Sequence, residues 1–114
     1  MKKVLVVDDS AFMRKLIGDF LTASKQLEVI GIARNGEDAI SKIKKFRPDV
    51  VTLDVEMPKM NGIEALRRIM VECPVPVVML SSTTKEGAEE TVKAMELGAV
   101  DFIAKPSGTI SLDL

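Results

Sequence analysis

The chain has 114 residues, which suits a single domain, and 46% of them are hydrophobic. Its 16 Lys and Arg residues nearly balance 17 Asp and Glu residues, so the formal net charge of −1 offers no basic field for nucleic acid or anionic lipid. With no His and a single Cys, the chain excludes Ser-His-Asp and Cys-His catalysis, His-based zinc sites and an internal disulfide, and it favours a reducing, cytoplasmic setting.

Five short apolar runs predict the strands, and they recur at intervals of about 20 to 30 residues. None approaches the roughly 20 residues that span a bilayer, so we expect no membrane insertion. The runs are continuous and rich in Val, Ile and Leu, which is typical of parallel strands covered on both faces. They are Val4–Val7, Val29–Ala33, Val50–Leu53, Val77–Leu80 and Phe102–Ala104.

Helical periodicity separates these runs. Asp9 or Ser10 is placed to cap the first helix. The other expected limits are Asn35 to Pro48 for the second helix, Asn61 to Pro74 for the third, and about Glu86 to Leu97, before Gly98, for the fourth. The residues expected to face inward are Phe12, Met13, Leu16, Ile17, Phe20 and Leu21 in the first helix, Ala39, Ile40, Ile43 and Phe46 in the second, Ile63, Leu66, Ile69, Met70 and Cys73 in the third, and Ala88, Val92 and Met95 in the fourth.

The alternation of strands and helices predicts an α/β fold with a parallel sheet, because parallel neighbours need crossover connections. For five strands the common doubly wound arrangement is the flavodoxin-like order 2-1-3-4-5, with a crevice outside the carboxyl ends of strands one and three. Only eight residues come after Pro106, so we expect the fifth helix to be missing or truncated. Apolar surface beside strands four and five would then be exposed and favour self-association.

Polar residues follow four of the predicted strands and should meet at one rim of the sheet. Asp8 and Asp9 follow the first strand, Asp54 the third, Ser81 the fourth and Lys105 the fifth. Two carboxylates about 4 Å apart repel by roughly 4 kcal/mol at an effective dielectric near 20. Protonation, Lys105 or a hard divalent cation could offset this repulsion. An all-oxygen acidic site suits Mg²⁺, and we favour Mg²⁺ acting together with Lys105.

Such a site suits phosphoryl transfer. A carboxylate can attack phosphorus and form an acyl phosphate, while a cation and an ammonium offset the charge of the transferred oxygens. Ser81 could then donate a hydrogen bond to a phosphoryl oxygen. Taken singly, these residues have plainer interpretations: an Asp after a strand is most often a helix cap, Ser81 begins a polar loop, and Phe102 is as readily a core residue.

Four motifs resemble the receiver domain of two-component response regulators over nearly the whole chain. They are Val4–Ser10, Asp54–Pro58 continuing through Asn61–Gly62, Val78–Ser82, and Gly98–Phe102 continuing through Lys105–Pro106. Asn61 stands where the family usually has Asp. The resemblance implies that Asp54 is the phosphoryl acceptor, that Asp8 and Asp9 are metal-binding acids, and that the Glu56 backbone carbonyl is a third protein ligand of the metal. It also implies that Lys105 is the charge partner, that the Ser81 hydroxyl follows the phosphoryl group, and that the rotamer of Phe102 reports this movement. In the family the bond that corresponds to Lys105–Pro106 is commonly cis.

Within that family, three segments resemble the amino-terminal receivers of chemotaxis protein-glutamate methylesterases: Asp54–Pro58, Pro74–Ser82 and Ala104–Gly108. This implies phosphorylation by a chemotaxis histidine kinase and control of a tethered methylesterase domain. The hydrolase triad of that esterase requires a His, which this chain lacks. We therefore interpret residues 1–106 as the receiver and 107–114 as the start of a linker to an absent effector, and whether the chain counts as an enzyme stays open.

Three other functions can be compared with this one. A phosphohydrolase with an aspartyl nucleophile usually carries a second Asp two residues later and a cap, whereas this chain has Glu56 and no insertion. A flavodoxin-like cofactor domain would need a phosphate-cradling loop where Asp8, Asp9 and Ser10 stand. A stand-alone receiver that docks on a motor or kinase shares the same site, and the parent gene's coding sequence after Leu114 would decide between it and a tethered receiver.

Overall fold

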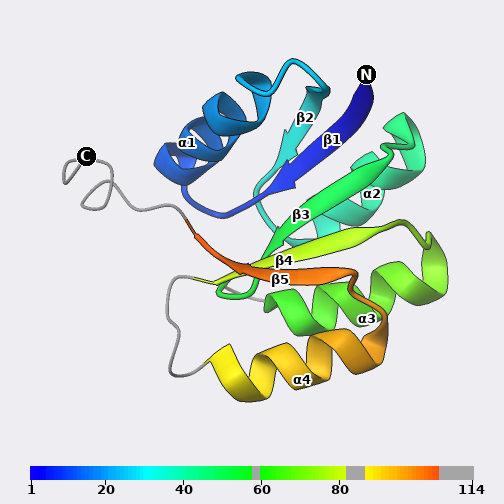
Figure 1. Cartoon of the computed structure of the whole chain (residues 1–114). Coiled ribbons are helices and arrows are strands. Elements are labelled where there is room, and N and C mark those ends of the chain that lie inside the picture. The colour runs from blue at the N-terminus through cyan, green and yellow to red at the C-terminus, as the bar shows by residue number, and fades with distance from the viewer. Residues whose placement is uncertain (58–59, 82–86, 106–114) are drawn as a thin grey trace, which may run out of the picture.

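The computed structural model describes residues 1–57, 60–81 and 87–105, and within them strands alternate with helices (Figure 1). The elements are β1 (Lys2–Val7), α1 (Ala11–Thr22), β2 (Leu27–Ala33), α2 (Gly36–Phe46), β3 (Val50–Asp54), α3 (Gly62–Glu72), β4 (Val77–Ser81), α4 (Gly87–Leu97) and β5 (Asp101–Ala104). Each expected strand and helix is present. The Lys105–Pro106 bond, residues 107–114 and any fifth helix lie outside the described residues.

All strand pairings are parallel, and the strand order β2-β1-β3-β4-β5 confirms the predicted topology. Val7 is paired with Leu53 across β1 and β3, and Ser81 with Ala104 across β4 and β5. Because the strands run in one direction, their carboxyl ends share one rim. None of the described helices is long and apolar enough to cross a membrane.

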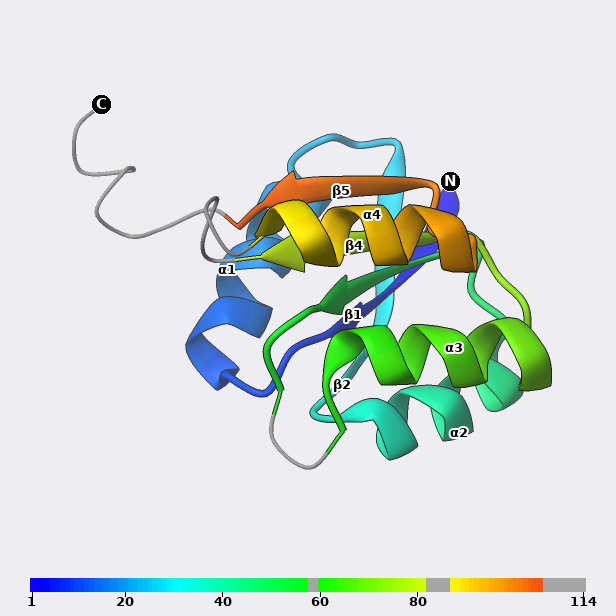
Figure 2. The same ribbon diagram turned by 90° about the horizontal axis from the view of Figure 1, so that it is seen from below.

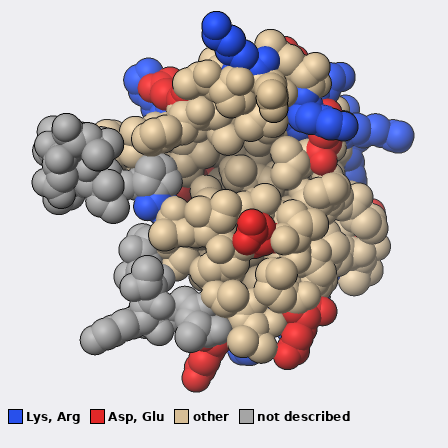
Figure 3. All heavy atoms as spheres, viewed as in Figure 1, with Lys and Arg blue, Asp and Glu red and all other residues tan. Residues whose placement is uncertain are grey.

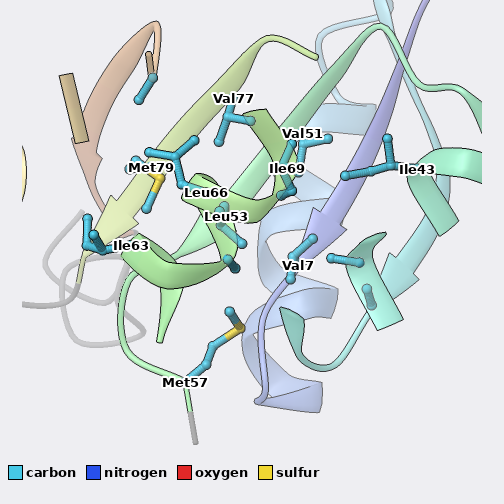
Figure 4. Close-up of a cluster of buried hydrophobic side chains, with 14 of the residues drawn as sticks. Val7, Ile43, Val51, Leu53, Met57, Ile63, Leu66, Ile69, Val77 and Met79 are labelled. Carbon is cyan, nitrogen blue, oxygen red and sulfur yellow. The ribbon is translucent and has the colours of Figure 1, made fainter. Parts of the chain in front are cut away.

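The sheet is covered unequally on its two faces. Helices α2, α3 and α4 lie on one face and α1 lies on the other (Figure 2). Successive strand residues point to opposite faces, so Leu5 and Val7 join the larger core while Val4 and Val6 join a smaller cluster with Ile17 of α1. The larger core, shown in Figure 4, includes Val51, Leu53, Leu66, Ile69, Val77 and Met79. Burial on both faces explains the continuous apolar runs.

Short polar side chains begin the first three helices. The Ser10 hydroxyl accepts a hydrogen bond from the Met13 amide at 3.2 Å, so Ser10 rather than Asp9 is the cap of α1. Asn35 and Asn61 cap α2 and α3 in the same way, each through its side-chain oxygen at 2.9 Å. Gly98 follows α4 with φ +113°, the left-handed geometry expected there. An Asn serves as well as an Asp at the start of α3.

Two of the residues predicted to face inward from α1 are exposed instead. Phe12 and Phe20 are 64% and 55% exposed. The helix instead directs Met13, Ile17 and Leu21 toward the sheet, at a spacing of four residues. The apolar stripe of this sequence is therefore wider than the face that the sheet covers, and the phenylalanines flank the contact. Phe46 of α2, also expected inward, is 39% exposed.

The predicted inward face of α4 is also wrong. Val92 and Met95 are exposed, whereas Ala94 is fully buried and Leu97 packs against the larger core. The methyl side chain of Ala94 allows the helix to approach its neighbours closely. The buried face of α4 is therefore the one that carries Ala94, about half a turn away from the face that carries Val92 and Met95. The side chain of Ala88 and the residue Glu86 lie outside the described part.

Apolar surface is exposed beside β4 and β5, as expected from a thinly covered flank. A groove of about 470 Å³ lies between α1 and the face of the sheet that this helix covers, with Phe20, Leu21, Leu80 and Ile103 among its lining residues. Ile103 is 47% exposed, so the described residues leave one face of β5 partly uncovered. The face seen in Figure 3 accordingly carries few charges, with Lys and Arg gathered at its margin. Self-association stays a prediction.

Candidate functional site

The carboxyl ends of β1 and β3 place two buried acids side by side. Asp8 follows β1 directly, Asp54 is the last residue of β3, and both are fully buried. Asp9 is next along the chain and is exposed. Carboxylate oxygens of these three residues lie within 4.8 Å of one another. The rim cluster predicted from the sequence is therefore present.

Lys105 is the positive charge of the cluster. Its Nζ lies 2.8 Å from Oδ1 of Asp54 and 3.1 Å from Oδ2 of Asp8, and only 10% of its side chain is exposed. Its backbone amide donates to the carbonyl of Ser81 at 2.8 Å, which extends the pairing of β4 and β5 by one residue. This bond anchors the base of the long side chain, so the ammonium is held between the two acids.

Backbone amides fix one oxygen of each buried carboxylate. The Ser10 amide donates to Oδ1 of Asp8 at 2.9 Å, and the Glu56 amide donates to Oδ1 of Asp54 at 3.0 Å. Oδ2 of Asp54 is buried and has no hydrogen-bond partner among the described residues. A buried carboxylate oxygen without a donor is costly, so this atom is available to a cation or to an electrophile.

The electrostatics of the two central residues differ. Burial raises the pKa of Asp54 from its ordinary 3.8 to about 7; the hydrogen bond from Lys105 opposes the rise and the charge of Asp8 adds to it. Burial by itself would lower the pKa of Lys105, but the hydrogen bond and charge of Asp54, together with Asp8, outweigh it and raise that pKa. Lys105 is therefore charged near neutral pH. Asp54 takes up a proton near pH 7 unless further positive charge lowers its pKa.

The three acids fit a magnesium ion. They offer only carboxylate oxygens, which hard divalent cations prefer, and Mg²⁺ needs few protein ligands because it keeps several waters. Oδ2 of Asp54 has no partner among the described residues, and the raised pKa of Asp54 shows that the Lys105 ammonium does not outweigh the cost of burying this carboxylate beside Asp8. The role of the Glu56 carbonyl as a further ligand stays a prediction.

Ser81 and Phe102 lie where the sequence placed them, but Ser81 makes an unexpected contact. Its hydroxyl is buried and donates to Oε1 of Glu56 at 3.1 Å, so the Glu56 side chain does reach the site. Phe102 of β5 is half-buried against the larger core. The role of the Phe102 rotamer stays a prediction.

Sequence reasoning missed two residues that shape the site. Arg14, on the first turns of α1, donates from its guanidinium to the Asp8 carbonyl at 2.9 Å. Gly62 lies so close to β3 that a Cβ there would be 2.1 Å from the Asp54 carbonyl oxygen. The Asn61–Gly62 pair is typical of a turn, and nothing in its pattern shows such a close approach.

Comparisons with known proteins agree with this geometry. Residues 4–113 match the family described as response regulator receiver domain. The chain is 72% identical over 112 residues to a protein-glutamate methylesterase/protein-glutamine glutaminase of Geobacillus kaustophilus, covering 98% of this chain and 32% of that protein. It therefore spans about a third of the length of such relatives.

Solved structures show the same fold. The response regulator domain of Thermotoga maritima CheB superposes with a TM-score of 0.88 at 51% identity, covering 98% of this chain and 84% of that one. A structure of the P1 domain of CheA3 in complex with CheY6 from R. sphaeroides gives a TM-score of 0.80 at 38% identity, covering 96% and 86%.

Proposed function

The chain belongs to the response regulator receiver domain family, of the type found in chemotaxis protein-glutamate methylesterases, and we propose that Asp54 is the phosphoryl acceptor of its switch. The observation that carries this proposal is the environment of the Asp54 carboxylate. Oδ1 is held by Lys105 and by the Glu56 amide, while Oδ2 is buried and unpartnered among the described residues. One oxygen is thus oriented and the other is free to react.

In the proposed reaction an oxygen of Asp54 attacks phosphorus. A bond forms between that oxygen and phosphorus, and the bond from phosphorus to the donor's nitrogen or oxygen breaks, with the electron pair leaving on the donor. The Lys105 ammonium, 2.8 Å from Asp54, then faces the negative oxygens of the new group. Mg²⁺ held by Asp8, Asp9 and Asp54 would supply further neutralisation of that charge.

The phosphorylated state is distinguished by new contacts. The group brings about 1.5 to 2 negative charges and several strong acceptor oxygens. We propose that Lys105 and Ser81 rearrange around it and that Phe102 on β5 follows the movement of Ser81. The signal is then a shift in the equilibrium between two conformations. The free energy of this shift equals the difference between the contact free energies that the phosphoryl group gains in each conformation.

We further propose the partners of this switch. A chemotaxis histidine kinase supplies the phosphoryl group, which is supported by the related complex of a CheA3 P1 domain with CheY6. The regulated partner is a tethered methylesterase domain, supported by relatives of which this chain covers 32%. In this scheme the receiver includes residues 1–106, the family match continues to residue 113, and the protein acts in the cytoplasm.

Treatment with acetyl phosphate and Mg²⁺ tests the acceptor by intact-mass spectrometry. The wild type is expected to gain one phosphoryl group, and omission of Mg²⁺ should reduce the gain strongly because the site then lacks the neutralising cation. Asp54→Asn keeps the shape of the side chain but cannot form the acyl phosphate, so it should gain none. Equal labelling of the variant and the wild type would refute the assignment.

A further inference from the structure

The Glu56 side chain links the acceptor strand to the neighbouring strand. It lies two residues beyond Asp54, and its carboxylate accepts a hydrogen bond from the Ser81 hydroxyl at 3.1 Å. The backbone amide of the same residue donates to Asp54 at 3.0 Å. Glu56 therefore contacts the acceptor with its backbone and the hydroxyl partner with its side chain.

These contacts form a closed ring around the site. From Ser81 the chain of contacts continues through its carbonyl to the Lys105 amide at 2.8 Å, and from the Lys105 ammonium back to Asp54 at 2.8 Å. Of the four residues, Glu56 alone has no role for its side chain in the reaction proposed above. Its side chain nevertheless accepts a hydrogen bond from the Ser81 hydroxyl.

A hydroxyl carries one proton, so it donates to one strong acceptor at a time. When the Ser81 proton is given to Glu56, it is not given to a phosphoryl oxygen on Asp54. The carboxylate is a charged acceptor and hence a strong competitor. Phosphorylation must break this bond before Ser81 can serve the new group.

We propose that Glu56 is a positioning residue that holds the Ser81 hydroxyl in the unphosphorylated arrangement and so opposes the phosphorylated one. This rests on the proposed function of Asp54 and deepens it. The hydrogen bond stabilises the resting state only. Its removal therefore shifts the population toward the state in which Ser81 faces the phosphoryl group.

A simpler effect has to be separated from this one. The negative charge of Glu56 repels a phosphoryl group whether or not Ser81 is present. Glu56→Gln separates the two, because its amide oxygen still accepts from Ser81 but the charge is gone. Pure repulsion would make Glu56→Gln behave like Glu56→Ala, whereas the positioning role keeps it closer to the wild type.

The test measures the affinity of the 114-residue chain for beryllofluoride, a phosphoryl analogue, in the presence of Mg²⁺ by fluorine NMR. Glu56→Ala is expected to raise the affinity about three- to tenfold, the size of one partly exposed charged hydrogen bond. Glu56→Gln should raise it less. In a Ser81→Ala background, Glu56→Ala should leave the affinity unchanged. A gain that persists without the Ser81 hydroxyl would overturn the proposal.

A second measurement needs no phosphoryl analogue. Unfolding of the wild type, Glu56→Ala, Ser81→Ala and the double variant in urea without Mg²⁺ should reveal a favourable coupling between the two residues, largely retained by Glu56→Gln. If the effects of the two substitutions on the free energy of unfolding are additive, the proposal is overturned. This holds even if Ser81→Ala binds no beryllofluoride. If the wild type binds none either, the proposed function of Asp54 fails, and the coupling then shows whether the resting contact exists.

Discussion

Replacing Asp54 with Asn is expected to stabilise the Mg²⁺-free protein at pH 8 by about 2–4 kcal/mol. The pKa of Asp54 is raised by burial to about 7 in the folded state, against about 3.9 in an unfolded chain. The folded state therefore holds this proton more tightly, and the stability it contributes is present below about pH 4 and lost as the pH rises through about 7. At about 1.4 kcal/mol for each unit between the two pKa values, the loss approaches about 4 kcal/mol. An Asn carries no charge and avoids it.

Urea unfolding at pH 5 and pH 8 measures this effect. The variant should exceed the wild type clearly at pH 8 and much less at pH 5, and Mg²⁺ should narrow the gap by binding the folded wild type. Asp19→Asn is the control, because Asp19 is 68% exposed and its ion pair with Lys15 lies in solvent. An Asp54→Asn protein no more stable than the wild type at pH 8 would contradict a burial cost of this size.

Gly62→Ala is expected to destabilise the protein by about 3 kcal/mol or more, although Ala is the better helix former. A Cβ at this position would lie 2.1 Å from the Asp54 carbonyl oxygen and 2.7 Å from Cα of Val55. Both are backbone atoms of the segment that leaves β3, so neither can move without shifting Asp54. The variant should therefore lose stability and phosphorylation together.

Gly18→Ala in α1 is the matched control for this substitution. Beyond its chain neighbours and the backbone of its own helix, no atom of the described residues lies within 4 Å of a Cβ built on Gly18, so the intrinsic helix preference acts alone there and should stabilise the protein by about 0.5–1 kcal/mol. Opposite signs for the two glycines in one set of urea titrations would confirm that close approach, rather than conformational preference, requires Gly62. Equal effects would show that β3 and α3 can separate without cost.

The sheet order and the rim cluster could be predicted because each depends on patterns local in the sequence. Continuous apolar runs mark buried parallel strands, and once those strands share a direction, residues such as Asp8 and Asp54 that come directly after them meet at one edge. The cost of gathering acids then calls for Lys105 and a cation. Family membership agrees with this reasoning and adds the specific roles that we propose.

The features that escaped prediction depend on how elements rotate and approach in space. The buried face of α4 is set by the small Ala94, while the larger Val92 and Met95 mark the wrong side. The bond between Glu56, two residues beyond β3, and Ser81, the last residue of β4, depends on the directions of both side chains. In α4 the larger apolar residues therefore give a misleading periodic signal, and the direction of the Glu56 side chain leaves no such signal at all.

The central claim is tested most directly by identifying which residue receives the phosphoryl group. Protein treated with acetyl phosphate and Mg²⁺ can be reduced with borohydride, which converts an acyl phosphate of aspartate to homoserine, and then digested and sequenced by tandem mass spectrometry. We expect homoserine at position 54 and at no other acid. Homoserine at Asp8 or Asp9 in place of position 54, or a fully labelled protein with none, would contradict the assignment of Asp54.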